Sequence, residues 1–84
     1  MPNVSVKFYM NLRTKAGTDE FPCQAGTVRH ALDCVRNKYG DDFMKHVRRC
    51  QVFVNSENVV HLKGQDTKLR QGDTLHIFPP AGGG

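Results

Sequence analysis

The last six residues of the chain, PPAGGG, are the segment best suited to chemistry. Their ionisable group is the α-carboxylate of Gly84, an anion at neutral pH because its reference pKa is about 3.5. Gly82 and Gly83 carry no Cβ, so they neither crowd a narrow channel nor restrict φ and ψ. Pro79 and Pro80 lack N–H groups and favour an extended backbone, so a strand cannot simply continue through them. We expect an extended tail of about 20 Å, at ~3.3 Å per residue, that presents a C-terminal carboxylate for capture by another protein.

The elements that must hold this tail begin with a strand over 3–10, in which apolar and polar residues alternate. Residues 11–17 (NLRTKAG) are interpreted as a short irregular turn that ends at glycine. Residues 19–24 are a weaker strand, and Pro22 places it at a sheet edge.

A helix is predicted over TVRHALDCVRNKYG, with Thr27 as its N-cap and Gly40 near its C-cap. Val28, Leu32 and Tyr39 belong to one apolar stripe of this helix. A second short helix is predicted over 41–48. Strands follow at QVFVN, at NVVHL in a hairpin, and at TLHIF, with KGQDTKL as a loop or single turn. One main helix on a mixed sheet is an α+β design.

Composition limits the classes of protein to consider. The chain has 84 residues, enough for one small domain. A net charge of +4 permits an acidic or phosphate-bearing partner but is no nucleic-acid signature by itself. Cys23, Cys34 and Cys50 form no CxxC pair, which favours free thiols in a reducing cytoplasm. We find no pattern of a secretory signal and no stretch of ~20 apolar residues, so we expect a cytoplasmic protein with no membrane contact.

This order of elements, with LRTKAG after the first strand, VFVN in the third, LRQGDTLHIFPP near the end and a terminal Gly-Gly, resembles the MoaD/ThiS family of sulfur carriers. The resemblance implies a ubiquitin-like β-grasp fold: a mixed four- to five-stranded sheet packed on one main helix. It implies a domain at 1–78 and an extended, flexible tail at 79–84. The segment IFPPAGGG is most similar to small subunits of molybdopterin synthase, although the family often has valine where Ala81 stands.

The resemblance also implies a reaction sequence. A partner adenylating enzyme, of the ubiquitin-activating type, uses ATP to adenylate the Gly84 carboxylate, and a sulfur donor displaces AMP to leave a thiocarboxylate. The large subunit of molybdopterin synthase then uses that sulfur to build the dithiolene of molybdopterin. The carrier contributes the reacting group but no general acid or base, and it binds no cofactor itself.

Other functions are compatible with the same C-terminal glycine segment. The chain could carry sulfur for thiamine, cysteine or thiolated tRNA synthesis, or it could be a ubiquitin-like modifier joined through Gly84 to lysines of other proteins. A glycine tail can also be a disordered terminus or a cloning scar, but its position after FPP at the end of a β-grasp pattern favours a function.

A docking face follows from the family's sheet order, in which the last strand lies between the first and third. Alternation then turns one set of residues toward the helix: Val4, Val6, Phe8, Val52, Val54, Leu75 and Ile77. It leaves Tyr9, Phe53, His76 and Phe78 on the opposite face, where an apolar patch usually marks an interface. Arg13 resembles a family position near that surface. The alternative is that these aromatic side chains only fill gaps under loops.

Three further motifs could carry chemistry. His30 and Cys34 are four residues apart on the helix, but no second pair accompanies them, so we expect no metal site. The cysteines are interpreted as small buried apolar residues rather than persulfide carriers. KHVRR at 45–49 with Arg29 and Arg36 could bind RNA, but we favour a solvated helical face that complements an acidic enzyme surface.

Overall fold

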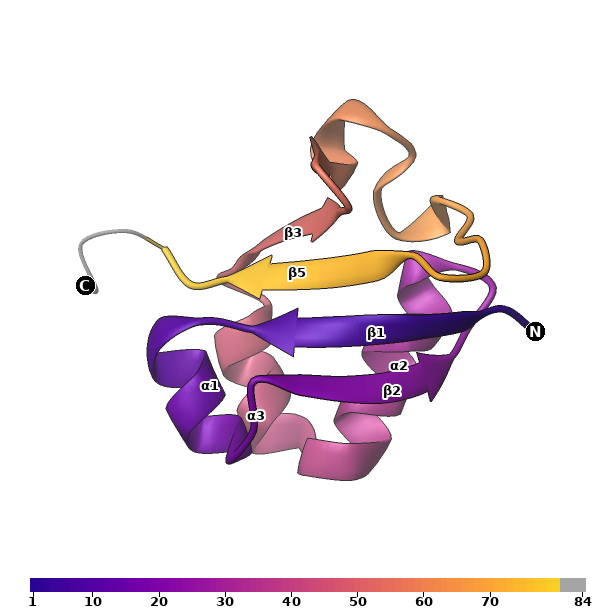
Figure 1. The fold of residues 1–84 in the computed structure, drawn as a ribbon. Helices are drawn as coiled ribbons and strands as arrows, with labels where there is room; N and C mark the ends of the chain where they lie inside the picture. Colours follow the sequence, from indigo (N-terminus) through magenta and orange to yellow (C-terminus); the bar gives the residue numbers. More distant parts are fainter. Residues whose placement is uncertain (81–84) are drawn as a thin grey trace.

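The computed structural model describes residues 1–80, which form a five-stranded mixed sheet with helices packed on one face (Figure 1). The strands lie in the order β2-β1-β5-β3-β4. Their bounds are β1 Asn3–Phe8, β2 Glu20–Gln24, β3 Gln51–Val54, β4 Glu57–Asn58 and β5 Thr74–Phe78. This is the ubiquitin-like β-grasp fold that the family resemblance implied.

The centre of the sheet is the parallel pair of β1 and β5, which lie side by side in Figure 1. β2 pairs antiparallel with β1 at one edge, so the prediction from Pro22 is confirmed. β3 pairs antiparallel with β5. The side chains of Val6, Leu75 and Ile77 are completely buried, because alternation turns them toward the helices. The other residues predicted to face the helices also pack into the core, although Val52 is half-buried.

The main helix, α2 (Val28–Tyr39), has the predicted ends. The Thr27 hydroxyl accepts a hydrogen bond from the backbone N–H of His30 at 3.2 Å, and the Gly40 N–H donates to the carbonyl of Arg36. The apolar stripe of α2 faces the sheet, and the short helix α3 (Asp41–Val47) follows directly. Both helices lie behind the sheet in Figure 1.

The prediction for residues 11–17 was wrong. This segment belongs to a helix, α1 (Met10–Ala16), and β1 therefore ends at Phe8. Leu12 is 1% exposed and anchors the helix to the core, while Gly17 ends it at φ 78° and donates to the carbonyls of Arg13 and Thr14. The N-cap Tyr9 makes no side-chain capping bond, so the sequence carries no start signal for this helix.

The predicted strand over 58–62 was also wrong. β4 has two residues, and the chain then turns into the 3-10 helix η1 (Val59–His61). The Asn58 side chain accepts a hydrogen bond from the N–H of Val60 at 3.0 Å, which starts the turn, and Val59 is buried instead of alternating along a sheet. A second 3-10 turn, η2 (Gly64–Asp66), follows in the segment predicted as a loop or single turn.

Among the described helices, none combines the length and the apolar character that a membrane crossing needs.

Candidate docking site at the root of the tail

Four aromatic side chains meet on the face of the sheet that the helices leave open. We call Tyr9, Phe53, His76 and Phe78 the aromatic cluster. Phe78 is its centre: its ring stacks on Tyr9 with centroids 4.3 Å apart, meets Phe53 edge-on at 5.4 Å and lies 6.1 Å from His76. All four side chains are half-buried, so each ring keeps an exposed part.

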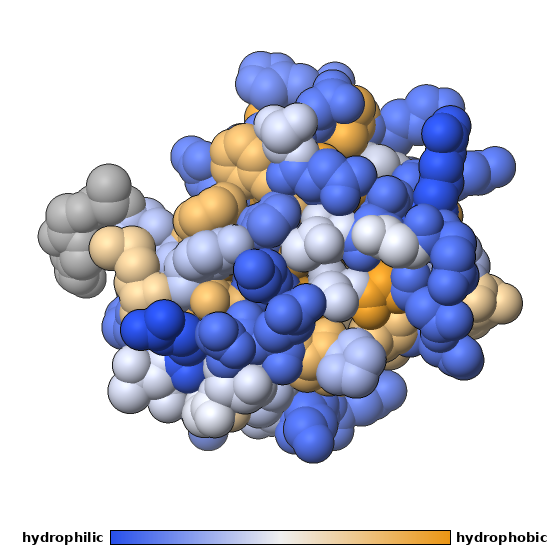
Figure 2. Space-filling model, in the orientation of Figure 1, coloured by the Kyte–Doolittle hydropathy of each residue, from blue (hydrophilic) through white to orange (hydrophobic). Residues whose placement is uncertain are grey.

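The sheet order brings the cluster together. Phe53 is directly opposite His76 across the β3–β5 pair, and Tyr9 follows the last residue of β1 beside the end of β5. Tyr9 has extended backbone angles, so the alternation of β1 continues to its side chain. Figure 2, which looks onto this face of the molecule, shows hydrophobic areas between hydrophilic side chains that cover most of the view. The structure therefore brings together all four residues that alternation assigned to this face.

A polar contact lies within the cluster. The Tyr9 hydroxyl and His76 Nδ1 share a hydrogen bond at 2.7 Å. Burial, and secondarily the charge of Lys7, lowers the pKa of His76 from its ordinary value of 6.5, with Glu20 opposing the shift. The imidazole is therefore neutral at physiological pH, which suits a face that loses water when a partner binds.

The described chain leaves the sheet next to the cluster. Phe78 is the last residue of β5, Pro79 is half-buried and Pro80 is exposed. The predicted tail residues Gly82 and Gly83 and the predicted reacting residue Gly84 lie outside the described residues. The two prolines end the strand as expected, because neither can donate to the ladder.

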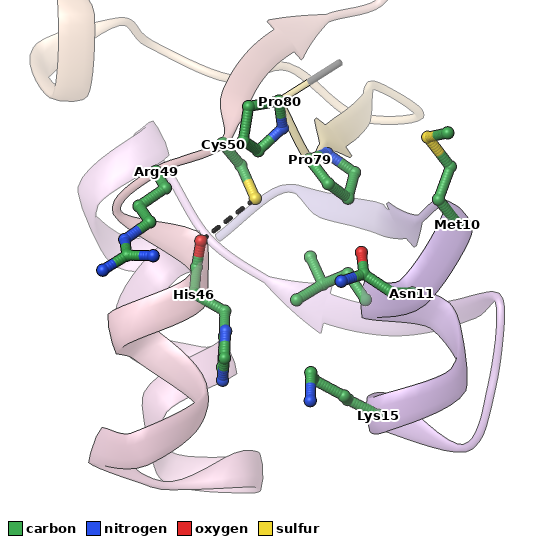
Figure 3. A pocket seen from close by; sticks show the side chains of 9 residues that line it. Met10, Asn11, Lys15, His46, Arg49, Cys50, Pro79 and Pro80 are labelled. Carbon is green, nitrogen blue, oxygen red and sulfur yellow. Dashed lines mark hydrogen bonds between the residues drawn. The ribbon is translucent and has the colours of Figure 1, made fainter. Parts of the chain in front are cut away.

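A cavity of about 350 Å³ lies at this point, between α1 and the end of α3 and beside Pro79 and Pro80 (Figure 3). We call it the tail-root notch. Lys15 of α1 and His46 of α3 contribute cationic or titratable groups, and Arg49 adds a third. The thiol of Cys50 also lines the notch and donates to the carbonyl of His46 at 3.2 Å. Burial raises the pKa of Cys50, so it is a protonated thiol rather than a nucleophile.

The family resemblance implied that Arg13 lies near the docking face. Arg13 is exposed on α1 and lines a shallow cleft with Thr18 and Asp19, not the tail-root notch. Lys15, which lines the notch, was missed because the segment 11–17 was interpreted as irregular, and Arg49, which also lines it, was considered only as part of the basic segment KHVRR. The helical form of segment 11–17 turns Leu12 and Lys15, three positions apart, toward the same side.

The remaining candidates from the sequence are the His30 and Cys34 pair and the cysteine thiols. Within residues 1–80 no cluster of three metal-ligating side chains surrounds His30 and Cys34 or any other pair. Burial, with a smaller contribution from Cys34, raises the pKa of Cys23 to about 12. This holds Cys23 as an inert thiol.

The supposed basic patch is mixed with acids. Arg29 pairs with Asp66 at 2.8 Å, and Arg36 pairs with Asp33 at 3.6 Å. Such exposed ion pairs are typical of a solvated helical face.

Comparison with known proteins places these features in a family. The model of the ThiS family matches residues 6–84. The chain belongs to the ThiS family. A protein from Archaeoglobus fulgidus that carries the provisional name of sulfur carrier protein is 26% identical over 88 aligned residues, covering 96% of this chain and 100% of the relative.

Solved structures share the fold. The small archaeal modifier protein 1 from Methanosarcina acetivorans is 31% identical with a TM-score of 0.87, and the alignment covers 100% of this chain and 98% of that one. A protein provisionally named molybdopterin converting factor subunit 1, from Pyrococcus furiosus, is 24% identical with a TM-score of 0.80, covering 96% and 100% of the two chains. The chain is therefore a ubiquitin-like protein of the sulfur-carrier and small-modifier type.

Proposed function

We propose that this protein carries sulfur for molybdopterin synthesis as the small subunit of molybdopterin synthase. The Gly84 carboxylate attacks the α-phosphate of ATP on an adenylating enzyme and releases pyrophosphate. A sulfur donor then displaces AMP and leaves a thiocarboxylate, and the large synthase subunit passes this sulfur to the pterin precursor. ATP belongs to the activating partner, and this chain supplies the acyl group alone.

The observation that carries the proposal is the position of the aromatic cluster at the root of the tail. Phe78, the centre of the cluster, is followed directly by Pro79 and Pro80. Four residues follow Pro80 in the sequence, and four extended residues reach about 13 Å. A partner that covers the cluster is therefore within reach of the Gly84 carbonyl.

Because the protein has one aromatic cluster and one tail, loading and sulfur transfer must occur one after the other. The loading enzyme and the large synthase subunit both need the cluster and the same terminal carbonyl. We therefore expect their complexes with this protein to be mutually exclusive, so the carrier must dissociate after loading.

Intact-mass spectrometry tests the loading step. The protein is incubated with ATP, the adenylating enzyme of the same organism and a sulfur donor. We expect one oxygen-to-sulfur exchange, located on the C-terminal fragment. The matched control lacks Gly83 and Gly84. It should keep the wild-type melting temperature, because no described core residue is touched, and it should show no exchange. Exchange in the truncated protein would refute the proposal.

The likeness to a small archaeal modifier protein favours a second candidate, a protein modifier. Loading would be the same, but a lysine amine instead of a sulfur donor would take the activated acyl group. Covalent conjugates in cell lysate that disappear when Gly84 is deleted would identify this function. Carriers for thiamine, cysteine or tRNA thiolation share the loading step and differ in the acceptor enzyme, so reconstitution with the large synthase subunit separates them from the first proposal.

A further inference from the structure

The tail-root notch has positive charge that nothing in the described chain neutralises. The residues that line it include Lys15, His46 and Arg49 and no Asp or Glu. The ion pairs formed among residues 1–80 use Arg29, Arg36 and Lys45, and none of them involves a cation of the notch. Figure 3 shows Lys15 and His46 extending from two different helices on opposite sides of the same opening.

The walls of the notch are largely apolar. Leu12, Met10, Pro79 and Pro80 are among the residues that line it. Met10 is 66% exposed and has φ 56°, a backbone conformation that residues other than glycine rarely adopt. Such positions persist where the surrounding structure holds them, and they are concentrated at binding and catalytic sites.

The notch lies on the side of α1 and α3 and adjoins the aromatic cluster only along the chain. Met10 follows Tyr9 of the cluster, and Pro79 follows Phe78. Because Pro79 and Pro80 line the notch, a protein that holds the tail at its root contacts the rim of the notch. At about 350 Å³ the cavity is at the lower end of the range for small-molecule sites, and it has room for one or two side chains.

We propose that the notch receives a carboxylate side chain, Asp or Glu beside an apolar residue, from the adenylating enzyme that loads the tail. The carboxylate accepts charge-assisted hydrogen bonds from Lys15 and Arg49, and the apolar neighbour packs against Met10 and the prolines. The inference rests on the proposed function, because it names the recognition chemistry at the root of the same tail. It adds a charged contact to an otherwise aromatic interface, and charged contacts of this kind select partners and speed their association.

A pair of matched double variants tests the charge. The notch variant is Lys15→Gln with Arg49→Gln, and the control is Lys38→Gln with Arg70→Gln, which removes the same charge from exposed positions outside the notch. Adenylation is followed by pyrophosphate release at increasing carrier concentrations. We expect KM to rise about tenfold or more in the notch variant and its dependence on salt to weaken. The control should match the wild type.

Equal KM values for the notch variant and the wild type would overturn the inference while leaving the proposed function intact. If the wild type itself is not adenylated, the proposed function fails instead. Melting temperatures of both variants check that the charge changes have not unfolded the domain.

Zero-length cross-linking tests the occupant. A carbodiimide joins an amine to a carboxylate in direct contact, forming an amide while the reagent takes up the lost water as a urea. With the adenylating enzyme present, we expect Lys15 to be linked to an Asp or Glu of that enzyme. A link from Lys15 to Gly84 of the same chain, a link to the large synthase subunit alone, or no link from Lys15 would each overturn the assignment.

Discussion

Replacement of Phe78 by alanine should separate binding from folding. The Phe78 ring contacts three other rings with centroids 4.3, 5.4 and 6.1 Å away. Each aromatic pair contributes about 0.5–1.5 kcal/mol beyond area burial. Because Phe78 is only half-buried, we expect a loss of about 1–3 kcal/mol in the free energy of unfolding, or a drop in Tm of about 5–20 °C.

Phe78→Ala should also weaken binding to the adenylating enzyme, and by more than the loss of a contact at the edge of the interface would. An aromatic residue at the centre of an interface typically contributes at least about 2 kcal/mol, which is roughly a 30-fold change in Kd. Calorimetric titration against the adenylating enzyme, at a temperature where the variant is fully folded, measures this change.

Phe21→Ala is the matched control for Phe78→Ala. Phe21 is also a half-buried phenylalanine with two strong ring contacts, to Phe8 at 6.1 Å and Tyr39 at 5.8 Å, but it packs on the helix side of the sheet. Phe21→Ala should lower Tm by a similar amount and leave the Kd for the adenylating enzyme unchanged. If the two variants weaken binding equally, or if Phe78→Ala binds as tightly as the wild type, the cluster is not the docking surface.

Three further substitutions and one labelling experiment test individual features of the fold. Thr27→Ala removes the α2 N-cap bond and should cost about 0.5–2 kcal/mol in urea unfolding; no change in the midpoint would show that the cap is dispensable. Gly17→Ala forces a side chain to φ 78° at the end of α1 and should cost about 1–2 kcal/mol by the same assay, whereas a more stable variant would contradict the assigned conformation. Because the pKa of His76 is lowered in the folded state, the unfolded chain binds its proton first as the pH falls. Stability should therefore be constant above about pH 6.5, decline below it, and decline less in His76→Asn; identical pH profiles would exclude His76 as the cause. Cys23, whose pKa is raised to about 12, should resist alkylation at pH 8 until the protein unfolds, and rapid labelling would contradict its burial.

Most of the sheet and the main helix followed from local patterns. The alternation in β1 and β5 and the stripe, cap and glycine of α2 are properties of residues two to four positions apart. The errors fell where local signals were weak. α1 has seven residues and no capping side chain at its start, which is too short for a stable isolated helix, so burial of Leu12 against the core is needed to hold it.

Several features were determined by the amino-acid order alone: the side-chain-free ending, the prolines that stop the last strand, and the choice of aromatic residues for one face. Each depends on residue type and on neighbours along the chain. The contacts between distant segments required the folded molecule. The hydrogen bond of Tyr9 to His76 joins residues 67 positions apart, and the notch brings Lys15 to the end of α3. Their meeting depends on the sheet order and on the placement of α1 and α3, which are set by burial of the whole core and by no local period.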